Sequence, residues 1–113
     1  ILFNPIETDR RGEVPENAQG YYLMPIFNWF SGKLSTLYTR RYIESARRFS
    51  DVPPISKMQL ESLDLFDQIA NDPSIRLDME FQPGDIQVLH NHQILHDRTS
   101  YKDWPELDLF KTQ

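Results

Sequence analysis

The 113-residue sequence predicts an α+β fold built on an antiparallel sheet or barrel. Two β-prone runs flank a Ser-Gly pair in the first third, two helical segments follow, and a strictly alternating strand comes after them. Because strands, helices and strands come in blocks with few crossovers, this order favours α+β over a doubly wound parallel sheet.

The opening of the chain is predicted to be a short strand followed by a long loop. Residues 1–3 are mostly apolar and suggest the strand. Residues 8–20 are polar and contain Gly12, Pro15 and Gly20, which are typical of a loop.

A β-hairpin is predicted next. The runs "YYLMPIFNWF" and "KLSTLY" are rich in aromatic and β-prone residues, and Ser31 and Gly32 separate them. Pro25 would place the first run at a sheet edge or a bulge, because proline cannot donate a ladder hydrogen bond.

Two helices are predicted in the middle of the chain. Residues 42–49 form the first, which "DVPPI" ends because proline cannot continue a helix. The second begins at Ser56, which has capping-box spacing with Gln59. Its apolar positions keep to one broad face, and "NDP" at residues 71–73 ends it.

The last third is predicted to contain two strands. Apolar and charged residues alternate over residues 75–81, which indicates a strand with one buried face. "QPGD" is typical of a turn, and "IQVL" at residues 86–89 predicts the next strand.

From its length and composition, we expect the chain to form one small domain of a soluble, cytoplasmic protein. The formal net charge of -5 argues against nucleic acid as a partner, because phosphate binding needs a basic surface. The absence of cysteine excludes disulfides and thiolate metal sites. No apolar run approaches the roughly 20 residues of a membrane span, and "ILFNPIETDRRGE" has no signal-peptide pattern, so we expect no membrane partner.

All three histidines lie within seven residues, directly after the last predicted strand. His90, His92 and His96 could form an all-histidine metal site, since imidazole is the commonest metal-ligating side chain. Alternatively, they are surface residues or hydrogen-bonding residues of a turn. The tripeptide "HNH" does not indicate a nuclease here, because the acidic chain offers no phosphate-binding surface.

The segment "DMEFQPGDIQVLHNHQILHDRTSYKDWPE" resembles the C-terminal part of the taurine dioxygenase and 2,4-dichlorophenoxyacetate dioxygenase family. The shared pattern is Pro-Gly-Asp, an apolar strand, a polar pair and Leu-His-x-Arg-Thr with an aromatic residue soon after. The stretches "DRRGEVPENAQGYYLMPIF" and "RRYIESARRF" are also similar to family members, so the resemblance covers nearly the whole chain.

The resemblance implies a double-stranded β-helix (jelly-roll) with inserted helices, of which this chain would be a part. It also implies an Fe(II)- and 2-oxoglutarate-dependent dioxygenase that oxidises a small, anionic organic substrate and releases succinate and CO2. Such enzymes hold iron with two histidines and one carboxylate. His96 matches the distal histidine ligand, and the resemblance gives His90 and His92 no ligand role. Arg98 lies two residues after His96, so on an extended stretch the two would share a face; Arg98 is therefore predicted to bind the cofactor through an anionic group, or to anchor a carboxylate beside the site.

The sequence departs from the family pattern at two places. It contains no His-x-Asp or His-x-Glu pair, and it ends at "LDLFKTQ" without the family's 2-oxoglutarate-binding arginine. We therefore expect residues 1–113 to be the C-terminal portion of a single catalytic domain that is inactive alone. Its partners would be the small-molecule substrate and either the remainder of that domain or a second copy.

Several alternatives stay open at this point. The chain could be a non-catalytic jelly-roll binding module, or an all-histidine metal-binding protein. Arg98 could instead pair with Asp97 or Asp103 at a strand end. Arg40 and Arg41 could hold an anionic substrate, although a solvated helix start is the simpler interpretation.

Overall fold

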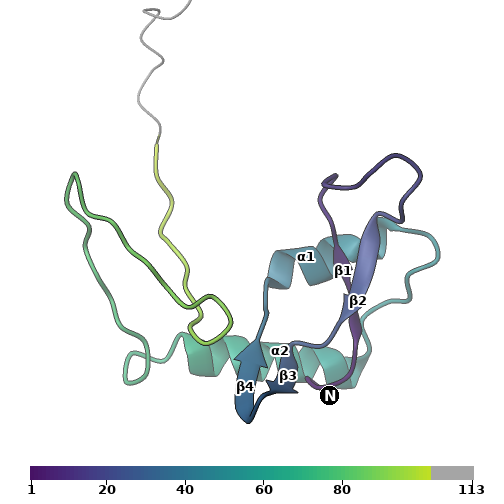
Figure 1. Cartoon of the computed structure of the whole chain (residues 1–113). Helices are drawn as coiled ribbons and strands as arrows, with labels where there is room; N and C mark the ends of the chain where they lie inside the picture. Colours follow the sequence, from purple (N-terminus) through teal and green to yellow (C-terminus); the bar gives the residue numbers. More distant parts are fainter. Residues whose placement is uncertain (103–113) are drawn as a thin grey trace, which may run out of the picture.

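The structure, a computed structural model, describes residues 1–102 of the chain. The described part is a small α+β arrangement of two antiparallel two-stranded sheets and two main helices, α1 and α2 (Figure 1). The expected jelly-roll is not formed within these residues and stays a prediction.

The first sheet joins β1 (Ile6–Asp9) to β2 (Tyr21–Met24), with Ile6 opposite Met24 and Asp9 opposite Tyr21. The prediction of a strand at residues 1–3 was wrong: these residues begin a turn in which the Asn4 amide donates to the Ile1 carbonyl. The predicted loop begins at residue 10 rather than residue 8, because Thr8 and Asp9 pair with β2.

The predicted hairpin is present, but only the second half of its first β-prone run takes part in it. β3 (Phe27–Phe30) pairs with β4 (Lys33–Thr36) across Ser31 and Gly32. Both turn residues have positive φ, 51° and 74°, as a two-residue hairpin turn of the I′ type requires. Pro25 separates β2 from β3, so the first β-prone run is divided between the two sheets.

Both predicted helices are present. The first consists of α1 (Arg40–Ser45) and a single 3-10 turn, η1 (Ala46–Arg48). The second is α2 (Lys57–Ala70), whose capping box is complete: the Gln59 amide donates to Ser56 Oγ at 3.2 Å, and the Ser56 amide donates to Gln59 Oε1 at 2.9 Å. Neither helix of residues 1–102 is long and apolar enough to cross a membrane.

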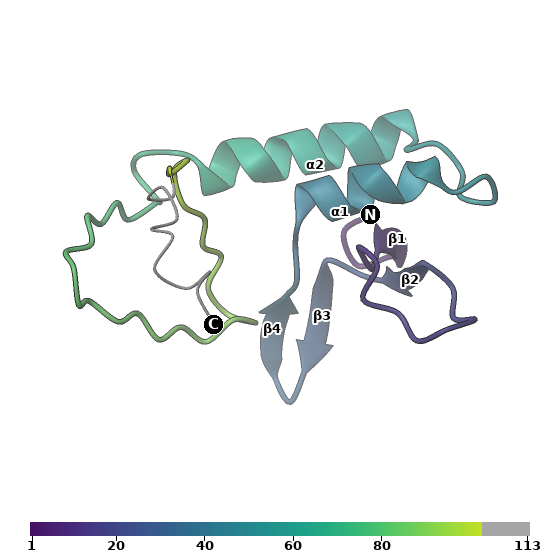
Figure 2. The same cartoon turned by 90° about the horizontal axis from the view of Figure 1, so that it is seen from above.

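A small core joins these elements. Ile6, Ile26, Ile43 and Leu63 are each at most 5% exposed and pack against one another, with Leu2, Phe27, Tyr38, Ile55 and Phe66 around them. The helices are also joined by charge, because Arg40 of α1 bonds to Asp64 and Asp67 of α2 at 2.8 and 2.9 Å. Figure 2 shows α1 and α2 side by side, on one side of the strands.

A buried carboxylate connects β1 to the first helix. Asp9 is 1% exposed and accepts hydrogen bonds from Arg48 Nε and Nη2 at 3.0 Å, from Ser45 Oγ at 2.7 Å, and from the Arg11 amide at 2.8 Å. The guanidinium of Arg48 is the main cause that lowers the pKa of Asp9 to about 2. The carboxylate is therefore ionised and fully partnered, which is how a charged group can be buried without a large penalty.

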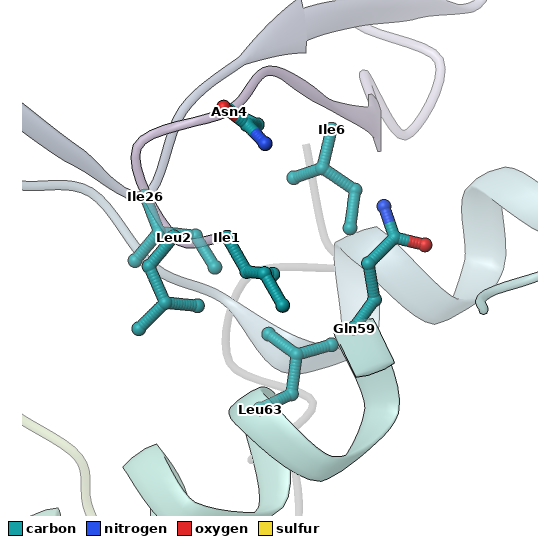
Figure 3. A pocket seen from close by; sticks show the side chains of 7 residues that line it. All are labelled: Ile1, Leu2, Asn4, Ile6, Ile26, Gln59 and Leu63. Carbon is teal, nitrogen blue, oxygen red and sulfur yellow. The ribbon is translucent and has the colours of Figure 1, made fainter. Parts of the chain in front are cut away.

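One small cavity lies within the core, between the N-terminal segment, β1 and α2. Its lining includes Ile6, Ile26 and Leu63 with the polar side chains of Asn4 and Gln59 (Figure 3). Its volume of about 10 Å³ is enough for one water molecule at most and far too small for an organic substrate.

The two strands predicted in the last third are absent from the described structure. Residues 75–81 and 86–89 form no helix or strand, and Leu77, Ile86 and Val88 are 81%, 88% and 89% exposed. The alternating pattern predicts that one face of the segment is buried, but a strand also needs a neighbouring strand to which it can hydrogen-bond. Residues 1–102 provide neither the neighbour nor a cover for that face. Trp29 of β3 is also 64% exposed.

Candidate functional site

The first two histidines lie in a tight turn. The amides of Gln93 and Ile94 both donate to the His90 carbonyl, at 2.9 and 3.1 Å, so residues 91–93 turn the chain. His90 and His92 therefore do not continue the preceding run as a strand and do not share a strand face. The alternative in which these histidines belong to a turn describes this geometry.

The histidine turn is attached to the outer edge of β4. The Thr36 amide donates to the His92 carbonyl at 2.8 Å, and Gln93 Nε2 donates to the Leu34 carbonyl at 2.7 Å. Both views show the chain reaching β4 at this point (Figures 1 and 2). Sequence reasoning missed Gln93, because an exposed amide between histidines carries no signal of a contact 59 positions away.

His96 follows this attachment in an irregular, exposed stretch. No group of three or more histidine, cysteine or acidic side chains is arranged to hold a metal within residues 1–102. All three histidines belong to that part, so the geometry does not bring them together as an all-histidine site. One imidazole cannot define a metal centre by itself.

Arg98 is held by an aromatic ring. Its guanidinium carbon lies 4.0 Å from the centre of the Tyr101 ring, and Nη2 donates to the Tyr101 hydroxyl at 3.2 Å. The neighbouring Asp97 accepts a hydrogen bond from the backbone amide of Arg98 at 2.8 Å. None of the ion pairs among the described residues includes Arg98, and Asp103 lies outside them.

The two arginines at the start of α1 differ in their surroundings. Arg40 bonds to Glu44, Asp64 and Asp67 at 2.7–2.9 Å, so its charge is used within the fold. Arg41 is exposed and has no ion pair within residues 1–102. It lines an open hollow together with residues 97–101. Arg40 is therefore not a solvated residue of the helix start but pairs within the fold, and the alternative that these arginines hold an anionic substrate stays a prediction.

Comparison with known proteins gives the family. The model of the taurine catabolism dioxygenase TauD, TfdA family matches residues 8–112. The chain is also similar to the FR-33289 synthase of Streptomyces rubellomurinus (strain ATCC 31215), with 33% identity over 98 residues, or 84% of this chain. It spans 28% of the length of that relative. From the match over almost its whole length, we conclude that the chain belongs to the TauD/TfdA dioxygenase family.

Proposed function

We propose that residues 1–113 are the C-terminal portion of the catalytic domain of an Fe(II)- and 2-oxoglutarate-dependent dioxygenase. The observation that carries this proposal is the family match, which runs through the segment containing His96 and Arg98. The chain's short span along its relative is consistent with a part of a larger domain.

His96 is proposed as one iron ligand. Its side chain is exposed and has no hydrogen bond within residues 1–102, so a nitrogen lone pair is available for coordination. The described residues thus fit one ligand position of a two-histidine, one-carboxylate centre and not the whole centre. Iron bound in such a centre activates O2 while 2-oxoglutarate is decarboxylated to succinate and CO2.

The contribution of the described residues is positional. The hydrogen bond from Thr36 and the hydrogen bond to Leu34 fix residues 92 and 93 on β4, four and three residues before His96. A ligand that follows a fixed backbone position loses less freedom when it binds a metal than one on an unattached chain. Arg98, two residues further, is held against Tyr101 and is proposed to face the carboxylate of a bound acid.

The exposed apolar face of residues 75–89 is proposed to pack against the remainder of the same domain or a second copy of the chain. Exposed apolar surface of this kind marks an interaction site, and strands form readily once a partner strand is present. On this proposal the segment becomes part of the jelly-roll sheet in the complete domain.

The test is succinate formation from 2-oxoglutarate by two proteins measured side by side. A protein that contains this segment within a complete family domain is expected to form succinate only when Fe(II) and O2 are both supplied. The 113-residue chain is expected to form none. Succinate formation independent of Fe(II) in the complete domain would contradict the dioxygenase proposal. Iron-dependent formation by the 113-residue chain would contradict the partial-domain proposal.

A further inference from the structure

An open hollow lies between the first turn of α1 and the segment that follows the histidines. Arg41 lines one part of it, and Asp97, Arg98, Thr99, Ser100 and Tyr101 line the rest. The fold therefore brings two arginines from distant parts of the sequence to one surface. The chain as a whole has a formal net charge of -5, so a surface with two arginines differs in charge from the rest of the molecule.

The two arginines retain hydrogen-bonding capacity. Among the ion pairs of residues 1–102, none includes Arg41 or Arg98. Arg98 uses one N–H on the Tyr101 hydroxyl, and a guanidinium has five. The Tyr101 ring, whose centre lies 4.0 Å from the guanidinium carbon, restricts the movement of that group, which reduces the freedom it would lose on binding a ligand.

The other lining groups are compatible with an anion. Thr99 and Ser100 each add a hydroxyl donor. The Asp97 carboxylate also lines the hollow, but one of its oxygens already accepts the backbone amide of Arg98 at 2.8 Å. The residues that line the hollow therefore carry two guanidinium groups and two hydroxyls, and only one carboxylate.

We propose that Arg41 and Arg98 together bind the oxyanion of a small organic acid. Guanidinium groups match the planar, two-oxygen geometry of a carboxylate and form charge-assisted hydrogen bonds with it. The position of the hollow, beginning one residue after His96, would place the bound acid beside the proposed iron ligand. The identity of the acid as cosubstrate or substrate rests on the proposed function; the binding itself does not.

The experiment is calorimetric titration of the metal-free 113-residue chain, in EDTA and at low salt, with 2-oxoglutarate and with propionate. Arg41→Gln and Arg98→Gln are compared with Arg10→Gln, which makes the same charge change at an exposed arginine outside the hollow. Each hollow variant is expected to weaken binding of both acids by roughly tenfold or more, and Arg10→Gln by less than about twofold. Arg41→Lys and Arg98→Lys are expected to be intermediate, because lysine keeps the charge but not the planar fork.

Two results would overturn the proposal. One is equal weakening by all three glutamine variants, which would reflect net charge alone. The other is a loss confined to one of the two hollow arginines. Because the mutated side chains are exposed, circular dichroism should be unchanged in every variant.

The same titration separates the two sources of the acid. Tighter binding of 2-oxoglutarate than of propionate would assign the site to the cosubstrate, and equal binding would assign it to the acid group of the substrate. His96→Ala should keep metal-free acid binding. Fe(II) binding is measured separately, in a complete family domain that contains this segment. Loss of iron binding by His96→Ala in that domain, with acid binding intact, leaves this inference standing, whereas a domain that binds iron but no acid overturns this inference alone.

Discussion

The chain divides into two regions of opposite character: a folded body, residues 1–72, and a histidine segment, residues 73–102. The body holds every buried side chain of the described part, including the core around Leu63 and the partnered carboxylate of Asp9. In the histidine segment no residue is in a helix or strand, and every residue except Leu89 is exposed. Apart from Arg41, an exposed residue of α1, the residues with candidate chemistry therefore lie apart from those that determine stability.

This difference implies that stability and ligand binding can be changed independently. Substitutions in the body should alter the free energy of unfolding, while substitutions of His96, Arg98 or Gln93 should leave it nearly unchanged. Within the described residues, two hydrogen bonds to β4 connect the histidine turn to the hairpin. Substitutions that remove one of these hydrogen bonds are therefore the most direct way to test whether the two regions are independent.

The largest effect on stability is expected from Leu63→Ala. Leu63 is 1% exposed and packs against Ile6, Ile26 and Ile43, so its truncation removes apolar contact and enlarges a cavity. The expected loss is about 2–5 kcal/mol in the free energy of unfolding, measured by urea denaturation. Leu65→Ala, at a 56% exposed position of the same helix, is the matched control and should cost less than about 1 kcal/mol. Equal losses in both variants would contradict a core centred on Leu63.

A smaller effect is expected from Asp9→Asn. The substitution removes the charge that Arg48 and Ser45 bond, and the expected loss is about 2 kcal/mol near neutral pH. Asp78→Asn is the control, because Asp78 is exposed and pairs only with Arg76 at the surface; it should change stability by less than about 0.5 kcal/mol.

The effect of Asp9 should also depend on pH. Its folded-state pKa of about 2 lies below the ordinary value of 3.8, so ionised Asp9 stabilises the fold above about pH 4. That contribution is lost as the pH falls towards 2. The difference in stability between the wild type and Asp9→Asn should therefore shrink between pH 4 and pH 2. A difference that is constant over this range would show that Asp9 acts through shape rather than charge.

The smallest effect on global stability is expected from Gln93→Ala. It removes the hydrogen bond to the Leu34 carbonyl, so the histidine turn should separate from β4 more often. Amide hydrogen exchange at Thr36 should accelerate by roughly 2–10-fold, as expected for one net hydrogen bond, while the urea midpoint stays unchanged. Gln87→Ala, an exposed amide with no hydrogen bond in the described part, should leave Thr36 exchange as it was. A lowered urea midpoint with unchanged exchange would contradict the separation of the two regions.

Locally encoded features were predictable from the sequence. The capping box of α2 depends on two side chains three residues apart, and the β3–β4 hairpin depends on two residues with positive φ. Both are fixed by neighbours in the chain, so spacing alone identifies them. The effect of Pro25 was predicted only in part: the run was expected to lie at an edge or a bulge, and it is instead divided between two sheets at this proline.

Features that depend on distant partners were not predictable. Residues 8 and 9 were predicted to belong to a loop, because no residue near them in the sequence indicates that β1 pairs with β2. The alternation over residues 75–81 predicts which face of the segment is suited to burial, but it does not indicate which part of the protein covers that face. The role of Gln93 depends on a carbonyl in another element. His96 was separated from His90 and His92 only by the family resemblance, since spacing alone treated the three alike.

The central claim, that His96 is an iron ligand and His92 is not, is tested most directly by Fe(II) binding in a complete family domain that contains this segment. Calorimetry should show that His96→Ala abolishes Fe(II) binding, because it removes a ligand. His92→Ala should keep binding, weakened by roughly 100-fold at most, because the His92 backbone carbonyl that bonds Thr36 is unchanged by the substitution. Retained iron in His96→Ala together with lost iron in His92→Ala would contradict the assignment.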